Sequence, residues 1–159
     1  MTPIGETWVD KAYQSGKNFP RKKSYRAWSQ GVLLNQQISA REKMCLFWIN
    51  HFVAEMDAVA DPRSNYDNTK LFYDNAFGSF QKLVEDVSIS HAMLIYLNGN
   101  TNKNGAPNEN YARELFELFS IGKGPLIAEG NYTNYTEEDI QQAARVLSGY
   151  TPSKIQIAK

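Results

Sequence analysis

Three charged residues at helical spacing are the first candidates for chemistry in this chain. Glu109, Arg113 and Glu117 fall within residues 108–122, a run that also carries aromatic and leucine side chains. On a helix, positions i, i+4 and i+8 lie on one face, so these three side chains stack along it. The pattern permits a surface ladder of salt bridges, a buried structural network, or an arginine held between carboxylates in a ligand-binding cleft.

Two further side chains are candidates for the same cleft. Asn108 is the first residue of the run and is suited to cap the helix, whose positive end favours the carboxylate of Glu109. His51 lies in a strongly apolar segment, and Glu55 follows four residues later. Such a pair could ligate a metal or exchange a proton, whereas the alternative is a packed histidine hydrogen-bonded to a neighbour. We assign no metal ligand and no catalytic residue, and the ligand-binding candidates are His51, Asn108, Glu109, Arg113 and Glu117.

Other motifs that bind cofactors or metals are incomplete. The run Asn100-x-Asn102-x-Asn104-Gly105 resembles the start of a calcium loop, but its early ligands are neutral amides and its twelfth position is Tyr111 instead of glutamate. We therefore interpret it as a turn in which asparagine side chains bond to nearby backbone. The sequence has no phosphate-binding glycine loop, cysteine-based zinc spacing or nucleophile elbow, so we assign no cofactor.

Composition predicts one folded domain. The chain has 159 residues, 42% of them hydrophobic and 13% aromatic, which argues against disorder. Residues 1–43 contain eight Lys/Arg and three acids, a net +5, and the rest of the chain carries −5. We expect these halves to dock on each other, because no nucleic-acid-binding motif accompanies the basic residues. No apolar stretch is long enough to cross a bilayer.

Hydrophobic periodicity is helical almost throughout, which predicts an all-α, irregular multi-helix bundle of about seven helices forming a single domain, residues 1–159. A central helix over 39–60 begins with an apparent capping box, Ser39 to Glu42, and Thr136 caps the last helix. Residues 62–68 and 123–135 are expected to be loops. The expected helices cover 6–14, 24–37, 39–60, 69–77, 79–98 with a break near 88–90, 108–121 and 136–148.

Four segments together resemble the bacterial family catalogued as domain of unknown function 1800 (DUF1800). They are residues 4–8 (IGETW), 41–52 (REKMCLFWINHF), 107–115 (PNENYAREL) and 135–139 (YTEED), the last continuing into 143–150 (AARVLSGY). The resemblance spans almost the whole chain in the family's order. Many members resemble Phe-Trp-His-Asn-His-Phe where this chain has Ile49 in place of the first histidine, which removes one ligand from any shared histidine metal site.

The resemblance implies a longer parent protein that is exported to the periplasm or the cell exterior, with this chain as an internal fragment. It implies a co-exported protein as partner and supplies no established activity. Our leading hypothesis is a helical core with a polar ligand-binding cleft that acts on envelope or extracellular material; whether it is an enzyme stays open. The alternative is a non-enzymatic helical scaffold that binds a partner protein, with no nucleic acid and no membrane span in either case. A cleft requires His51 to converge with Glu109 and Arg113, whereas a scaffold requires self-paired charges and an apolar patch elsewhere.

Overall fold

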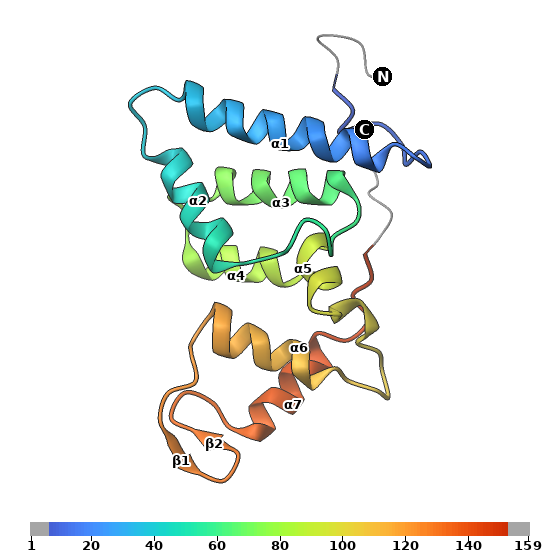
Figure 1. Cartoon of the computed structure of the whole chain (residues 1–159). Helices are drawn as coiled ribbons and strands as arrows, with labels where there is room; N and C mark the ends of the chain where they lie inside the picture. The colour runs from blue at the N-terminus through green and yellow to red at the C-terminus, as the bar shows by residue number, and fades with distance from the viewer. Residues whose placement is uncertain (1–6, 153–159) are drawn as a thin grey trace.

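The computed structural model describes residues 7–152, which form seven α-helices and one small sheet (Figure 1). The predicted helical architecture is confirmed, but the chain is not purely all-α, because the loop expected over 123–135 contains an antiparallel pair of strands. A 3₁₀ turn, Gly99–Thr101, follows α5, and a π-helical turn, Leu115–Phe119, continues α6. The elements are α1 (Asn18–Asn35), α2 (Arg41–His51), α3 (Pro62–Asp74), α4 (Phe80–Ser88), α5 (His91–Tyr96), α6 (Glu109–Glu114), β1 (Leu126–Ala128), β2 (Asn131–Tyr132) and α7 (Glu137–Val146).

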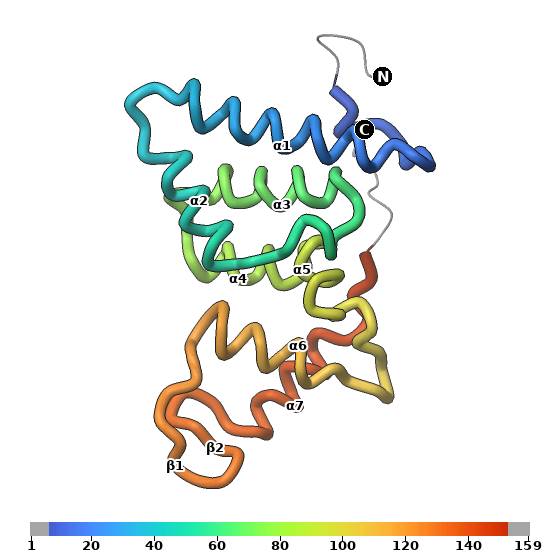
Figure 2. The backbone as a smooth tube through the Cα atoms, in the orientation of Figure 1, coloured from blue at the N-terminus to red at the C-terminus, as the bar shows by residue number. Residues whose placement is uncertain are grey.

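The helices form two groups along the length of the molecule. In the first, α1, α3 and α4 are stacked in roughly parallel layers and α2 crosses beside them, as the backbone trace in Figure 2 also shows. Helix α3 contacts all of its neighbours, α1, α2, α4 and α5, so it is the central helix. In the second group, α6 packs against α7, and the β1–β2 hairpin extends beyond them.

The prediction of a central helix over residues 39–60 is wrong in its bounds and in its central position. Helix α2 ends at His51, and Phe52 leaves helical geometry with φ −98° and ψ 64°. Phe52 is buried between the aromatic rings of other elements, so tertiary packing overrides the helical periodicity that continues in the sequence. The predicted capping box is also absent, because Ala40 occupies the N-cap position and Ser39 accepts only from the backbone N–H of Arg41.

Residues 62–68, expected as a loop, are the first half of α3. Pro62 is the first helical residue, where a missing N–H costs nothing because that group has no partner within a helix. Asp61 precedes it as N-cap and accepts from the backbone N–H of Arg63 at 3.0 Å. The Asp-Pro pair therefore starts a helix here instead of ending one.

The expected first helix also fails within the described chain; its first residue, Glu6, lies outside the described part. Residues 7–17 form turns that are anchored to α1 by side chains. Trp8 is buried and donates from Nε1 to Ser24 Oγ at 2.9 Å, while Arg21 donates to the carbonyl oxygen of Ala12. Helix α1 starts at Asn18, ahead of the expected 24, because Pro20 is tolerated within its first turn.

Several local predictions are confirmed. The break near residues 88–90 separates α4 from α5, and Ser79 and Ser90 cap these two helices. Thr136 and Asp139 form a capping box at the start of α7, since each side chain accepts from the other residue's backbone N–H. Gly122 follows the π-helical turn with φ +70°, a conformation that suits glycine.

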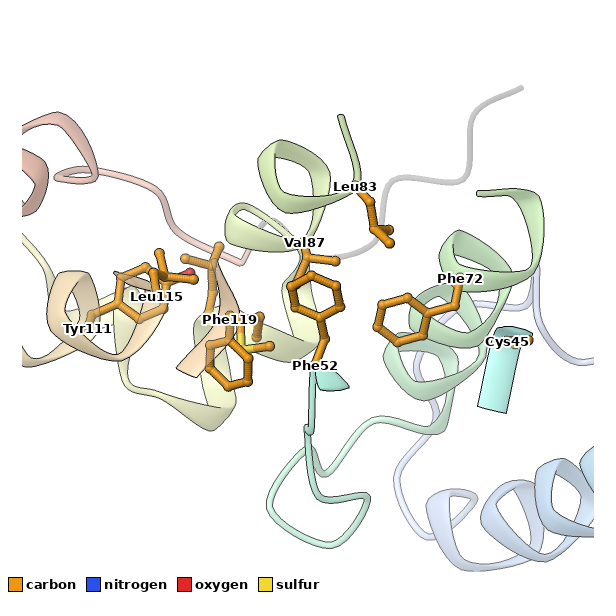
Figure 3. Packing of buried hydrophobic residues seen from close by; sticks show 10 residues of the cluster. Cys45, Phe52, Phe72, Leu83, Val87, Tyr111, Leu115 and Phe119 are labelled. Carbon is orange, nitrogen blue, oxygen red and sulfur yellow. The ribbon is translucent and has the colours of Figure 1, made fainter. Parts of the chain in front are cut away.

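The main core joins the two groups of helices. Figure 3 shows Phe52 between Phe72 of α3 and Phe119 of the π-helical turn, with both ring centroids 5.9 Å away. This buried cluster also includes Leu83 and Val87 of α4 and Tyr111 of α6. A second, smaller cluster around Ile140 and Ala144 holds α7 against Ala112 of α6.

Candidate functional site

The charged side chains of α6 pair with α7 and with the hairpin. Arg113 forms its ion pair with Glu137, the first residue of α7, and not with the carboxylates four residues away on either side. Glu117 accepts a hydrogen bond from the hydroxyl of Tyr135, and Lys123 Nζ lies 3.4 Å from the same carboxylate oxygen. These five residues connect α6, the π-helical turn, the hairpin and α7, and we call them the α6–α7 network.

Electrostatics within the α6–α7 network favour its charged forms. The hydrogen bond from Tyr135 lowers the pKa of Glu117, and nearby Lys123 acts in the same direction. Burial and the adjacent Glu117 carboxylate raise the pKa of Tyr135, which keeps its hydroxyl protonated as a donor. The Glu137 carboxylate raises the pKa of Arg113. Opposite charges therefore balance within the network.

Glu109, Arg113 and Glu117 do not pair with one another as the predicted ladder requires. Glu109 is exposed at the start of α6, whereas Arg113 and Glu117 turn toward α7 and Tyr135. Tyr135 is 3% exposed, and about a third of the Arg113 and Glu137 side chains remains accessible. The geometry therefore shows contacts of Arg113 with α7 and of Glu117 with Tyr135 in place of a ladder along one helix.

His51 lies at a different place from the charged part of α6. Its Nε2 is 3.1 Å from the carbonyl oxygen of Phe119, at the far end of the π-helical turn. Around it stand the rings of Phe47, Trp48, Phe52 and Phe80. This environment is that of a packed histidine hydrogen-bonded to a neighbour.

The proposed pairing of His51 with Glu55 loses its basis, because α2 ends at His51 and the i, i+4 spacing no longer places both side chains on one helical face. Within residues 7–152 no three His, Cys, Asp or Glu side chains are grouped as metal ligands.

Asn108 caps α6, as its sequence position suggested. Its Oδ1 accepts from the backbone N–H of Tyr111 at 3.1 Å, and its Nδ2 donates to the carbonyl oxygen of Asn98 at 2.9 Å. The backbone N–H of Asn108 in turn donates to Oδ1 of Asn102 at 2.8 Å. These contacts hold the asparagine-rich loop against the start of the helix.

The five sequence candidates thus occupy four places. His51 lies among aromatic rings, Asn108 is in the asparagine loop, Glu109 is exposed at the start of α6, and Arg113 and Glu117 belong to the α6–α7 network. Within the described part of the chain, no hydrogen bond or ion pair joins His51 to Glu109, Arg113 or Glu117.

Sequence reasoning overlooked several residues that organise these places. Tyr135 and Glu137 flank the cap residue Thr136, and nothing in that local pattern indicates which helix they face. Asn102 is interpreted from the sequence as part of an asparagine turn, but it is 1% exposed and contacts α7. A buried Ser64 lies with its Oγ 2.6 Å from His91 Nδ1, beside the Asp61–Arg63 ion pair, and its position among polar residues gave no signal for this contact.

Comparison with known proteins identifies a family but no activity. The profile of a family described as "Protein of unknown function (DUF1800)" matches residues 8–158, almost the whole chain. No curated protein and no solved structure shows a significant match. Within the described residues, no helix is long and apolar enough to cross a membrane.

Proposed function

We propose that this chain, which belongs to the DUF1800 family of unknown function, is a non-enzymatic helical scaffold that binds a partner protein. The observation that carries the proposal is the pairing of Arg113 with Glu137 and of Glu117 with Tyr135 and Lys123. A catalytic site needs charged groups left available for a substrate, whereas these groups are used to join α6 to α7.

Exposed apolar side chains elsewhere also support the scaffold. Leu34 and Ile38, beside the end of α1, are 82% and 110% exposed, and Trp28 and Leu46 nearby are also accessible. Clusters of exposed apolar side chains are typical of surfaces that bind other proteins. The charged network and the apolar surface lie on different groups of helices, as a scaffold predicts.

The competing proposal is the polar cleft that acts on envelope or extracellular material. The partial exposure of Arg113 and Glu137 favours it, because a ligand could reach both side chains. Export of a longer parent protein stays a prediction from the family resemblance, and immunoblotting of periplasmic and culture-medium fractions checks it.

Substitution of Arg113 distinguishes the two proposals. In a scaffold, Arg113→Ala removes the link between α6 and α7 and the packing of the arginine stem, so the free energy of unfolding should fall by about 1–2 kcal/mol. Arg113→Lys should recover part of that loss. Arg145→Ala on the exposed side of α7 is the matched control and should change the free energy by at most about 0.5 kcal/mol.

Urea unfolding monitored by circular dichroism measures these differences. Unchanged or increased stability of Arg113→Ala would contradict the scaffold, because residues held in place for a ligand often cost stability. That outcome would return Arg113 and Glu137 to consideration as ligand contacts.

A further inference from the structure

An apolar groove lies where α1, α2 and α3 meet. It has a volume of about 70 Å³, and its lining includes Trp28, Leu33, Leu46, Ile49 and Tyr73. Pockets for cofactors and drug-sized ligands commonly measure about 300–1,000 Å³, so this groove is too small for such molecules. Its volume suits one or two apolar side chains.

The groove is chemically inert. Cys45, the single cysteine of the chain, lines it and donates from Sγ to the carbonyl oxygen of Thr69 at 3.7 Å. Burial raises the pKa of the Cys45 thiol to about 11, so the reactive thiolate is scarce at neutral pH. These properties indicate a docking surface and argue against thiol chemistry in the groove.

Other apolar side chains are exposed close to the groove in the sequence. Leu34 directly follows the lining residue Leu33, and Ile38 lies in the connection that leads into α2. Both are more exposed than any core residue of these helices, and Trp28 and Leu46 are exposed at the groove itself. A partner helix that places one side chain in the groove would also cover Trp28 and Leu46, which is the usual helix-in-groove arrangement.

The rim of the groove is positively charged. Residues 18–49, which form α1, the connection and most of α2, contain six basic residues and one acid, Glu42. Two carboxylates offset part of this charge: Glu42 lines the groove, and Asp57 lies 3.0 Å from Lys22 and 3.8 Å from Arg26. The basic residues remain in excess. Lys43 is exposed three residues before Leu46, and Arg26 is exposed three residues before Ser29, so both stand on helix faces that border the groove.

We propose that this groove binds an amphipathic helix of a partner protein, with apolar side chains on one face and acidic side chains at its flanks. The inference rests on the proposed scaffold function and adds the place and the chemistry of the partner. The apolar face supplies burial, and the acidic flanks complement Arg26 and Lys43, whose charges chiefly affect association rate and salt dependence.

Two designed peptides test the inference on the complete 159-residue chain. The first is a helical peptide with leucines at positions i, i+4 and i+7 and glutamates at its flanks; the second replaces each glutamate with lysine. Isothermal titration calorimetry measures their affinities, and ¹H–¹⁵N spectra locate binding through the indole N–H of Trp28 and the amides of Leu33 and Leu46. We expect the acidic peptide to bind at least about tenfold more tightly at low salt, with the difference shrinking as salt rises.

Variants of the chain connect binding to the groove. Leu46→Asp, at an already accessible position, should weaken binding of the acidic peptide by at least about tenfold, because it places a charge at the centre of the contact. Val146→Asp is the matched control on α7 and should leave affinity unchanged. The double variant Arg26→Glu, Lys43→Glu should reverse the preference toward the lysine peptide.

Three results would overturn the inference. They are equal affinity for the two peptides, insensitivity to Leu46→Asp, and no binding of either peptide up to about 1 mM, the weak end of measurable affinity. None of them alters the outcome for Arg113→Ala, so the failure of this inference can be told apart from the failure of the scaffold proposal.

Discussion

Asn102 donates from Nδ2 to the carbonyl oxygen of Ala144 at 2.8 Å, although 42 residues separate them in the chain. The Oδ1 of the same amide accepts from the backbone N–H of Asn108 and from the hydroxyl of Ser148. One buried side chain therefore joins the asparagine loop, the start of α6 and the end of α7.

Asn102→Ala should reduce the free energy of unfolding by about 2–4 kcal/mol, because it leaves several buried polar groups without partners. Asn104→Ala, at an exposed position of the same loop, is the control and should change it by at most about 0.5 kcal/mol. Urea unfolding of both variants measures the difference. Equal midpoints for the two variants would show that the amide of Asn102 is dispensable.

Glycine substitutions test packing between α5, the 3₁₀ turn and α6. A Cβ at Gly99 would stand 2.9 Å from ring carbons of Tyr111, whose hydroxyl donates to the carbonyl oxygen of Ser88. Gly99→Ala should therefore cost about 1–3 kcal/mol in unfolding free energy. Gly31→Ala is the matched control, since a Cβ there meets nothing within 4 Å and alanine favours the interior of α1 by about 0.5–1 kcal/mol. The melting temperatures of the two variants should shift in opposite directions from that of the wild-type chain. Shifts in the same direction would contradict the packing argument.

The histidine of α5 should make stability depend on pH. Burial lowers the pKa of His91, with Arg63 acting in the same direction and Asp61 opposing it. The folded state thus favours neutral His91, and the unfolded state binds the proton more readily. This contribution to stability is complete above the ordinary histidine pKa of about 6.5 and is lost as pH falls below that value.

The variant His91→Gln isolates this effect. Between about pH 7.5 and about pH 5.5, the wild-type chain should lose more unfolding free energy than the variant, because only the wild-type chain carries the His91 imidazole. Urea midpoints at the two pH values supply the comparison, and carboxylates that titrate in both proteins cancel. Identical losses would mean that His91 titrates in the fold as it does in the unfolded chain.

The single cysteine supplies a chemical test of the region around the groove. With a pKa of about 11 and 6% exposure, Cys45 should react with iodoacetamide at about pH 8 at least a hundredfold more slowly in the folded chain than in guanidinium. Mass spectrometry measures the rate, and each molecule can acquire only one adduct. Fast alkylation of the folded chain would indicate that α2 and α3 separate readily at Thr69.

Local signals in the sequence predicted the features that depend on neighbouring residues. The capping box at Thr136, the cap at Asn108 and the break before Ser90 follow from side chains that bond to backbone only a few residues away. Helical periodicity predicted the overall class for the same reason. Asp61-Pro62 shows the limit of such signals, because the same pair can follow one helix or begin the next.

Long-range contacts decided the remaining features. Helical periodicity continues beyond His51, but burial of Phe52 between Phe72 and Phe119 ends α2 there. The spacing of Arg113 and Glu117 placed both on one helical face, yet the approach of α7 and Tyr135 selected their partners. The sequence by itself determined the mainly helical class, the caps at Asn108 and Thr136 and the positions of the charges, since those properties are local. Only the tertiary structure determined which of them meet, because pairing across 18 or more residues depends on how whole helices pack.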